Sequence, residues 1–280
     1  MTFDNGIFRY EIVNGATRII KGAYSEVEIK IPSEINGCPV TEIKNGAFCN
    51  CENLTSIEIP DSVTSIGDNA FCNCWKLTSI TIPNSVTTIG YEAFKNCSRL
   101  ESIIIPDSVT NIEFETFYWC KNLKNVTIPD GVTTIGRNAF EDCHSLTTII
   151  IPDSVTDIGY GAFESCHSLT NITIPDGVTT INKETFMFCV SLESIIIPNS
   201  VTNIGKKAFY NCNNLTSITI PNSVITIEER AFHGCDSLAN KPAETVYSCN
   251  PRIPYGYMMW GGEIRDALPH GRRYYMNKRR

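Results

Sequence analysis

The stretch that decides the fold is residues 77–99, which read LTSITIPNSVTTIGYEAFKNCSR. The same 23-residue pattern recurs as L-x-x-I-x-I-P-[DN]-[SG]-V-T-x-I-G-x-x-A-F-x-x-C-x-x, without a change in register. Its leucine occupies Leu54, Leu77, Leu100, Leu123, Leu146, Leu169, Leu192, Leu215 and Leu238. A constant period of this length is typical of a solenoid, in which each unit buries its apolar side against its neighbours.

Each segment of the unit has a predicted structural role. Residues 77–82 end in alternating isoleucine and threonine, the period of two that indicates a half-buried strand. Pro83 ends this strand because proline has no amide hydrogen to donate, and the polar pair after it supplies turn chemistry. Gly90 is expected to allow a tight bend, and Ala93-Phe94-x-x-Cys97 to form one short helical turn. The predicted fold class is therefore a repeat solenoid, a right-handed coil with a parallel β-sheet on one face and short helical turns on the other.

The ends of the chain depart from the pattern, so three regions are expected. Residues 1–23 are predicted to form an N-terminal β-hairpin cap, because apolar and polar residues alternate over 8–20 around the turn pair Asn14-Gly15. Residues 24–240 form the array of 23-residue units. Residues 241–280 do not follow the repeat and are expected to form a C-terminal cap and a basic tail.

The repeat motif resembles the BspA-like, Treponema-pallidum-type class of leucine-rich repeat over roughly residues 24–240. The longer opening unit, which begins Ile31-Pro32-Ser-Glu-Ile, resembles the way such arrays often start. This resemblance implies a leucine-rich-repeat coil. It also implies a surface or secreted protein of a bacterium or protist, and several members of the class are implicated in adhesion.

The cysteines follow the repeat. Nine of the thirteen close the Ala-Phe-x-x-Cys motif: Cys51, Cys74, Cys97, Cys120, Cys143, Cys166, Cys189, Cys212 and Cys235. Such regular spacing favours a ladder of reduced, buried thiols over the disulfide framework of a small secreted domain. A metal site at Cys49-x-Cys51 and Cys72-x-Cys74 is the alternative, since zinc ligands also occur as spaced cysteine pairs.

Three surfaces are candidates for contact with a partner. On the outward face of the predicted sheet, isoleucine recurs at Ile104, Ile150 and Ile196, although isoleucine is also simply a good strand residue. The variable edge of the unit carries bulky side chains, for which packing between coils is the alternative, and we single out Phe114, Tyr118, Trp119 and Phe188 as protein contacts. The third surface is the C-terminal tail.

Charge is distributed unevenly along the chain. Residues 241–280 hold eight Lys or Arg against three Asp or Glu, whereas the whole chain has a net charge of −7. The tail is expected to contact an acidic protein, nucleic acid or an anionic membrane surface, or simply to cap the array. Its candidate residues are Arg272, Arg273, Lys278, Arg279 and Arg280.

Nothing in the sequence predicts catalysis, a cofactor or a catalytic metal. A nucleophile stands next to a base in the sequence at Cys143-His144 and Cys166-His167. The side chains of adjacent residues, however, rarely reach the same reacting atom. The leading hypothesis is a non-enzymatic scaffold that binds a protein partner of unknown identity. The alternatives are a structural subunit of a larger assembly, anchored by the basic tail, and a cell-surface adhesin.

The sequence as given shows no secretory or transmembrane segment, so it predicts a cytoplasmic or other reducing compartment. A cell-surface or secreted location is expected instead if a signal peptide has been removed.

Overall fold

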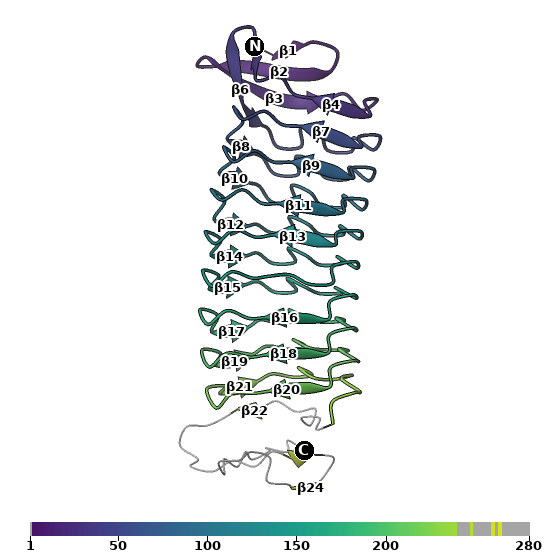
Figure 1. The fold of residues 1–280 in the computed structure, drawn as a ribbon, viewed down its shortest axis with the longest axis vertical. Helices are drawn as coiled ribbons and strands as arrows, with labels where there is room; N and C mark the ends of the chain where they lie inside the picture. The colour runs from purple at the N-terminus through teal and green to yellow at the C-terminus, as the bar shows by residue number, and fades with distance from the viewer. Residues whose placement is uncertain (1, 240–246, 249–258, 261–262, 265–280) are drawn as a thin grey trace.

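In a computed structural model of the chain, the described residues are 2–239, 247–248, 259–260 and 263–264. They form a β-solenoid of about nine turns with parallel sheets, which confirms the predicted repeat solenoid. Figure 1 shows the coils as an elongated stack with the N-terminal end at the top. Each coil corresponds to one repeat, because strands pair with residues 23 positions further along the chain.

The first column of parallel strands is the predicted sheet. It begins with the paired strands β4–β7–β9 and continues as β11–β13 and then β16–β18–β20. Their bounds are β4 (Glu28–Lys30), β7 (Ser56–Glu58), β9 (Ser79–Thr81), β11 (Ser102–Ile104), β13 (Asn125–Thr127), β16 (Asn171–Thr173), β18 (Ser194–Ile196) and β20 (Ser217–Thr219). Within it, Thr148 forms an isolated parallel bridge to Asn171. The central residue of each strand faces the core and its two neighbours face outward.

A second column of parallel strands was not predicted. It is made by the Thr-x-Ile part of each repeat, whose last isoleucine points into the core. Its members are β6 (Cys38–Ile43), β8 (Ser65–Ile66), β10 (Thr88–Ile89), β12 (Asn111–Ile112), β14 (Thr134–Ile135), β15 (Asp157–Ile158), β17 (Thr180–Ile181), β19 (Asn203–Ile204) and β21 (Thr226–Ile227). Segments of two residues are too short to show a period of two in sequence, which is why the pattern did not reveal them.

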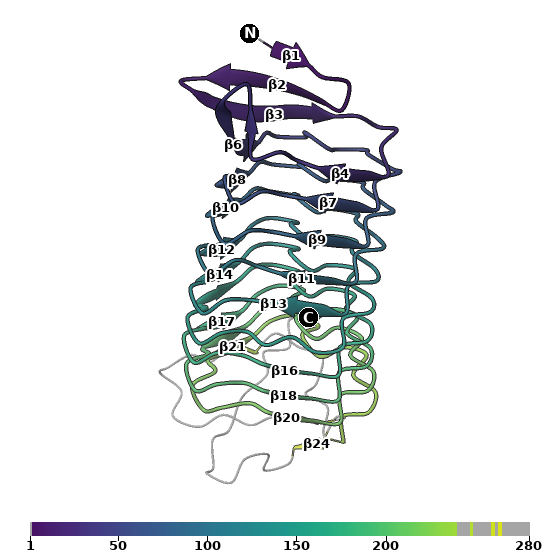
Figure 2. The ribbon, with the colours of Figure 1, turned by 45° about the horizontal axis from the view of Figure 1, so that its top comes forward.

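Antiparallel strands lie across the N-terminal end of the stack (Figure 2). Strands β1 (Thr2–Asp4), β2 (Phe8–Val13) and β3 (Ala16–Gly22) pair in order, and β3 then pairs in parallel with β6. Strand β5 (Glu34–Ile35) pairs with the start of β6. Towards the other end, β22 (Tyr247–Ser248) pairs antiparallel with β21, and β23 (Met259–Trp260) pairs with β24 (Glu263–Ile264).

The predicted helical turns are not found, since the described residues contain no helix. Around Phe71, hydrogen bonds within the coil alternate with bonds between coils. Cys72 N donates to Asn69 O at 3.1 Å, whereas Phe71 N donates to Ala93 O of the next coil at 2.8 Å. Packed helices lie about 8–10 Å apart, but backbones that hydrogen-bond side by side lie about 5 Å apart. A helical turn in every coil would therefore hold the coils too far apart for the sheets to pair.

The core is a set of ladders in which identical residues stack. Nine phenylalanine rings from Phe48 to Phe232 stack with centroids 5.2–5.7 Å apart and planes within 14° of parallel. Beside them, each ladder thiol from Cys74 to Cys235 donates to a phenylalanine carbonyl of the preceding coil at 3.0–3.3 Å. All described cysteines are free, and the nine ladder cysteines are buried.

The repeated glycine serves close approach rather than the tight bend we expected. Gly90 does not have a positive φ, and a Cβ added there would lie 2.5 Å from the backbone nitrogen of Asp68 in the preceding coil. Gly159 meets Arg137 N at the same distance. The absence of a side chain lets successive backbones approach closely enough to hydrogen-bond.

Three coils of the regular array lack this glycine, and the second column is interrupted at two of them. Glu113 and Asn182 occupy the glycine position, and β10 does not pair with β12, nor β15 with β17. In the other coils an amide at this position donates to the isoleucine carbonyl of the preceding coil at 2.7–2.9 Å. The Asn182 side chain replaces that bond by donating to Ile158 O at 2.7 Å.

The same two coils carry threonine in place of the repeated alanine. The hydroxyls of Thr116 and Thr185 donate to the carbonyls of Glu113 and Asn182, at 2.9 and 2.8 Å. Glu228, near the end of the array, keeps its ladder bond to Ile204 and is followed by Ala231, so a side chain at the glycine position does not by itself open the ladder. The second column is therefore interrupted in the two coils that carry both substitutions, one at the glycine position and one at the alanine position.

The stacked core predicts a position-dependent cost of truncation. Phe140 is fully buried in mid-array, so Phe140→Ala is expected to lower the free energy of unfolding by about 3–5 kcal/mol. Phe232→Ala should cost less, because fewer coils depend on that ring. Denaturant unfolding of both variants measures the difference, and equal losses would contradict stability that is summed from coil to coil.

The interrupted coil can be converted to the common sequence. Glu113→Gly with Thr116→Ala is expected to close the ladder and protect the amides of residues 110 and 113 from hydrogen exchange. Two additional backbone bonds should raise the free energy of unfolding by about 1–2 kcal/mol. Glu228→Gly is the matched control, since its ladder bond already exists, and should give no gain. Unchanged exchange at residues 110 and 113 would show that other residues open the ladder.

Candidate functional site

The side of the solenoid formed by turns offers the most varied surface. We define the turn face as the residues from three before each stacked phenylalanine to four after it, for example 91–98 and 114–121. In every coil the residues two before and two after the phenylalanine have a positive φ. This conformation suits glycine and asparagine. Of the three residues between these positions, the first two are buried, and the third is half-buried in most coils.

Trp119 and Phe188 are unusual occupants of one of these positions. At φ values of 61° they stand where the other coils carry Asn, Asp, Ser or Gly. In the first coils, Asn50, Asn73 and Asn96 form a side-chain ladder there with bonds of 2.8 and 3.0 Å. A bulky aromatic residue is disfavoured in this conformation, and such strain is concentrated at functional sites. Both aromatics belong to the two coils that interrupt the second strand column.

Trp119 is the exposed centre of an aromatic and cationic cluster. Its side chain is 39% exposed and stacks on Tyr118, with centroids 6.1 Å apart. The Lys121 ammonium lies 4.2 Å from the Trp119 ring centroid, and Lys95 lies 5.2 Å from that of Tyr118. Lysine over an aromatic face is a favourable cation–π arrangement that holds the ring in place without covering it.

The other two predicted aromatic contact residues, Phe114 and Phe188, lie in different coils. Phe114 is half-buried in the same coil as Trp119, with the Arg137 guanidinium 5.8 Å from its ring. Phe188 is half-buried three coils further on, roughly 15 Å away along the stack, and packs edge-on against Tyr210 at 5.7 Å. The structure therefore stacks Tyr118 on Trp119, places Phe114 in the same coil and leaves Phe188 in a second cluster.

Half-buried carboxyl groups occupy the turn face between the two aromatic clusters. Burial, together with the negative charge of Glu164, Asp142 and Glu115, raises the pKa of Glu141 to about 8. Burial, together with the charge of Glu184 and Asp142, raises the pKa of Glu164 to about 7. Sequence analysis missed this feature. Its one signal is glutamate directly after the phenylalanine in two consecutive coils.

Two histidines lie beside these carboxyl groups. The rings of His144 and His167 stack at 4.4 Å, and His144 Nε2 is 3.0 Å from Asp142 Oδ1. The neighbouring thiol of Cys143 is fully buried and donates to Phe117 O, and burial raises its pKa well above the usual range. The Cys143 side chain thus points into the core and the His144 side chain points outward, so the two do not form a nucleophile–base pair.

The outward surface of the first strand column, which we call the sheet face, presents isolated apolar side chains. Ile104, Ile150 and Ile196 are 69%, 83% and 70% exposed. They lie in every second coil, roughly 10 Å apart along the stack. The residues between them are the exposed threonines Thr127 and Thr173, so the three isoleucines form a spaced lane rather than a continuous patch.

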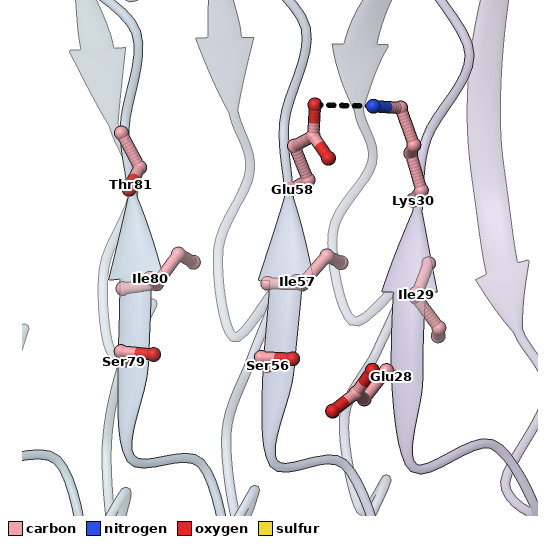
Figure 3. Close-up of a pocket in the computed structure, with 9 residues that line it drawn as sticks. All are labelled: Glu28, Ile29, Lys30, Ser56, Ile57, Glu58, Ser79, Ile80 and Thr81. Atoms are coloured by element: carbon pink, nitrogen blue, oxygen red, sulfur yellow. Dashed lines mark hydrogen bonds and ion pairs between the residues drawn. The ribbon is translucent and has the colours of Figure 1, made fainter.

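Charge is present at the N-terminal end of the sheet face, where the repeat pattern did not reveal it. There β4, β7 and β9 line a hollow of about 480 Å³. Figure 3 shows its outward side chains, with Lys30 paired to Glu58 at 2.7 Å and Glu28 at the other end of β4. Strand β4 precedes the first repeated leucine, so only the alternation Glu28-Ile29-Lys30 could have indicated its outward residues.

The remaining predicted contacts, Arg272, Arg273, Lys278, Arg279 and Arg280, lie outside the described residues. Within the described ranges there is no cluster of three or more His, Cys, Asp or Glu side chains placed to hold a metal ion. The same part of the chain has no helix with the length and hydrophobicity needed to cross a membrane.

Comparison with known proteins identifies relatives of the array. Residues 41–170 and 110–239 match the family described as BspA type leucine rich repeat region. A solved leucine rich cell surface protein from Faecalibacterium prausnitzii is 29% identical, with a TM-score of 0.54 and coverage of 85% of this chain and 87% of that one. The leucine rich repeat protein of T. pallidum is 26% identical, with a TM-score of 0.54 and coverage of 78% and 92%. No curated protein matches the chain.

The carboxyl groups on the turn face predict a pH-dependent stability. Folding raises the pKa of Glu141 from its ordinary value of 4.5 to about 8. A carboxyl group whose pKa rises on folding stabilises the fold below its unfolded pKa, and this contribution is lost as pH rises from about 4.5 to about 8. Glu141→Gln should therefore raise the thermal midpoint at pH 8 by a few degrees and leave it nearly unchanged at pH 4.5. Glu52→Gln, the same change on an exposed turn residue, is the control. A gain that is equal at both pH values would exclude titration of Glu141 as its cause.

Proposed function

Because the chain belongs to the BspA-type leucine-rich repeat family, we propose that it is a non-enzymatic scaffold whose turn face binds a protein partner. The array is rigid along its length, since hydrogen bonds and stacked rings join each coil to the next. A rigid surface loses little conformational entropy on binding, which favours recognition. The chemistry of the partner is then selected by the side chains that vary from coil to coil.

The observation that carries this proposal is the placement of Trp119. It is exposed, it adopts a conformation that disfavours bulky residues, and it replaces the asparagine ladder of the earlier coils. Neither core packing nor turn formation requires a tryptophan at this position. Aromatic anchors of this kind, together with arginine, dominate the binding energy of protein interfaces.

The sheet face is the weaker candidate for the main contact. Its outward side chains are mostly small or β-branched, and Ile104, Ile150 and Ile196 stand apart from one another. Such a surface can add buried apolar area, but it has few groups that discriminate between partners. We assign these isoleucines to a secondary contact lane.

Two other functions have specific support. The excess of Lys and Arg in residues 269–280 favours a structural subunit whose tail contacts an anionic partner. The likeness to a cell surface protein of F. prausnitzii favours an adhesin displayed outside the cell. In both cases the repeat array would still present its turn face for recognition.

Substitution of Trp119 tests the main proposal. A partner is first captured from the source cells with the full chain, and its affinity is then measured by surface plasmon resonance. Trp119→Asn installs the residue that other coils carry at this backbone conformation, so the fold should persist. The loss of an aromatic anchor is expected to cost about 2 kcal/mol or more of binding free energy. Thr127→Ala, on the exposed sheet face, is the control and should bind normally.

The other surfaces predict different outcomes of the same measurement. Binding that ignores Trp119→Asn and disappears in moderate salt, or in a chain that ends at Ala239, would place the contact on the basic tail. Binding abolished by Ile150→Asp alone would place it on the sheet face. Either result would contradict the turn face as the principal surface.

A further inference from the structure

Two cysteines outside the buried ladder occupy the same position in consecutive coils. Cys49 and Cys72 each follow directly after a stacked phenylalanine, and those two rings lie 5.3 Å apart in nearly parallel planes. The backbone beside them is held in register, because Asn50 N donates to Cys72 O at 2.8 Å. Disulfides join residues whose Cα atoms are about 4.4–6.8 Å apart, and stacked backbones at about 5 Å satisfy this requirement.

The two thiols already contact each other. Burial, together with the charge and hydrogen bond of Cys49 and the charge of Glu92, raises the pKa of Cys72 to about 12, whereas Lys95 in the next coil opposes this rise. Cys49 is half-buried and Cys72 is 7% exposed. A reagent from solution therefore reaches Cys49 first, and Cys72 lies beside it in the next coil.

The nine ladder cysteines differ from this pair in access and in hydrogen bonding. Cys212 and Cys235 are also in register and in contact, but both are fully buried and each thiol donates to a backbone carbonyl. Oxidation of a ladder pair would break those bonds and require the coils to open. No backbone carbonyl partner is found for Cys49 or Cys72 in the described part of the chain, so their thiols can react without such a loss.

We propose that Cys49 and Cys72 form a redox-active dithiol that closes to a disulfide between the first two repeat coils by exchange with a small disulfide such as glutathione disulfide. The Cys49 thiolate attacks one sulfur of the small disulfide and forms a mixed disulfide, releasing one glutathione thiolate. The Cys72 thiolate then attacks the Cys49 sulfur and releases the second glutathione thiolate. The protein loses two electrons and two thiol protons, and these electrons and protons appear in two molecules of reduced glutathione.

The order of the two steps follows from the surroundings of Cys72. In the reduced pair, a thiolate at Cys49 and its hydrogen bond suppress ionisation of Cys72. Once Cys49 is held in the mixed disulfide it carries neither charge nor thiol hydrogen, so both of its effects on Cys72 are lost, while the opposing effects of Lys95 and Glu92 remain. The second step therefore becomes easier after the first, and the mixed disulfide is short-lived.

The test is oxidation of the reduced full-length chain with glutathione disulfide, followed by acid quenching and mass spectrometry. Cleavage after glutamate, at Glu52 and Glu58, separates the peptide that contains Cys49 from the one that contains Cys72. In the unsubstituted chain we expect these two peptides to be joined by a disulfide, with no glutathione left on Cys49. In Cys72→Ser we expect a persistent glutathione adduct on Cys49 and no cross-link. Cys49→Ser should form neither product.

Cys38→Ser is the matched control, because Cys38 is also half-buried but lies outside the pair, and it should keep the cross-link. Circular dichroism checks that each variant folds. Lys95 and Tyr118 occupy the same column, which shows that the position accepts other side chains, and Cys72→Ala replaces the serine variant if that one unfolds. A stable glutathione adduct on Cys49 of the unsubstituted chain, or a cross-link that survives Cys49→Ser, would overturn the proposal.

Discussion

The spacing of about 5 Å between hydrogen-bonded backbones is the constraint on which the rest of this molecule depends. It places every residue beside its equivalent in the next coil, so one favourable contact is repeated along the whole array. The phenylalanine rings follow this spacing, with centroids 5.2–5.7 Å apart. It also explains the glycine at position 90, which lets two backbones approach closely, and the absence of helix from the described residues, because helices are too wide to stack at this distance.

The same constraint makes departures from the repeat informative. In the coils of Phe117 and Phe186, the glycine, the alanine and the asparagine of the common sequence are all replaced, and there the second strand column is interrupted. These coils also carry Trp119 and Phe188. A locally weaker ladder and a bulky aromatic side chain on the turn face thus occur together, as is common where a protein trades stability for recognition.

Stacking also sets the chemistry of titratable groups on the turn face. Glutamates in consecutive coils face one another, and half-burial leaves too little water to screen them, which raises the pKa of Glu141 and Glu164. Cysteines in consecutive coils face one another in the same way. In the core this yields buried thiols that donate to carbonyl groups, and at Cys49 and Cys72 it yields a pair that solvent can reach through the half-buried Cys49.

The sequence by itself determined the repeat, its length, the first strand column, the buried ladder residues and the family, because these depend on periodicity within 23 residues and on the preference of apolar side chains for the core. It also located the variable aromatic residues. Only the tertiary structure decided that the Ala-Phe-x-x-Cys segment is a chain of turns, that Thr-x-Ile pairs as a second column, and that Glu141 meets Glu164. The physical reason is that these features arise between residues one coil apart, and the distance between coils is set by the stack as a whole rather than by any single repeat.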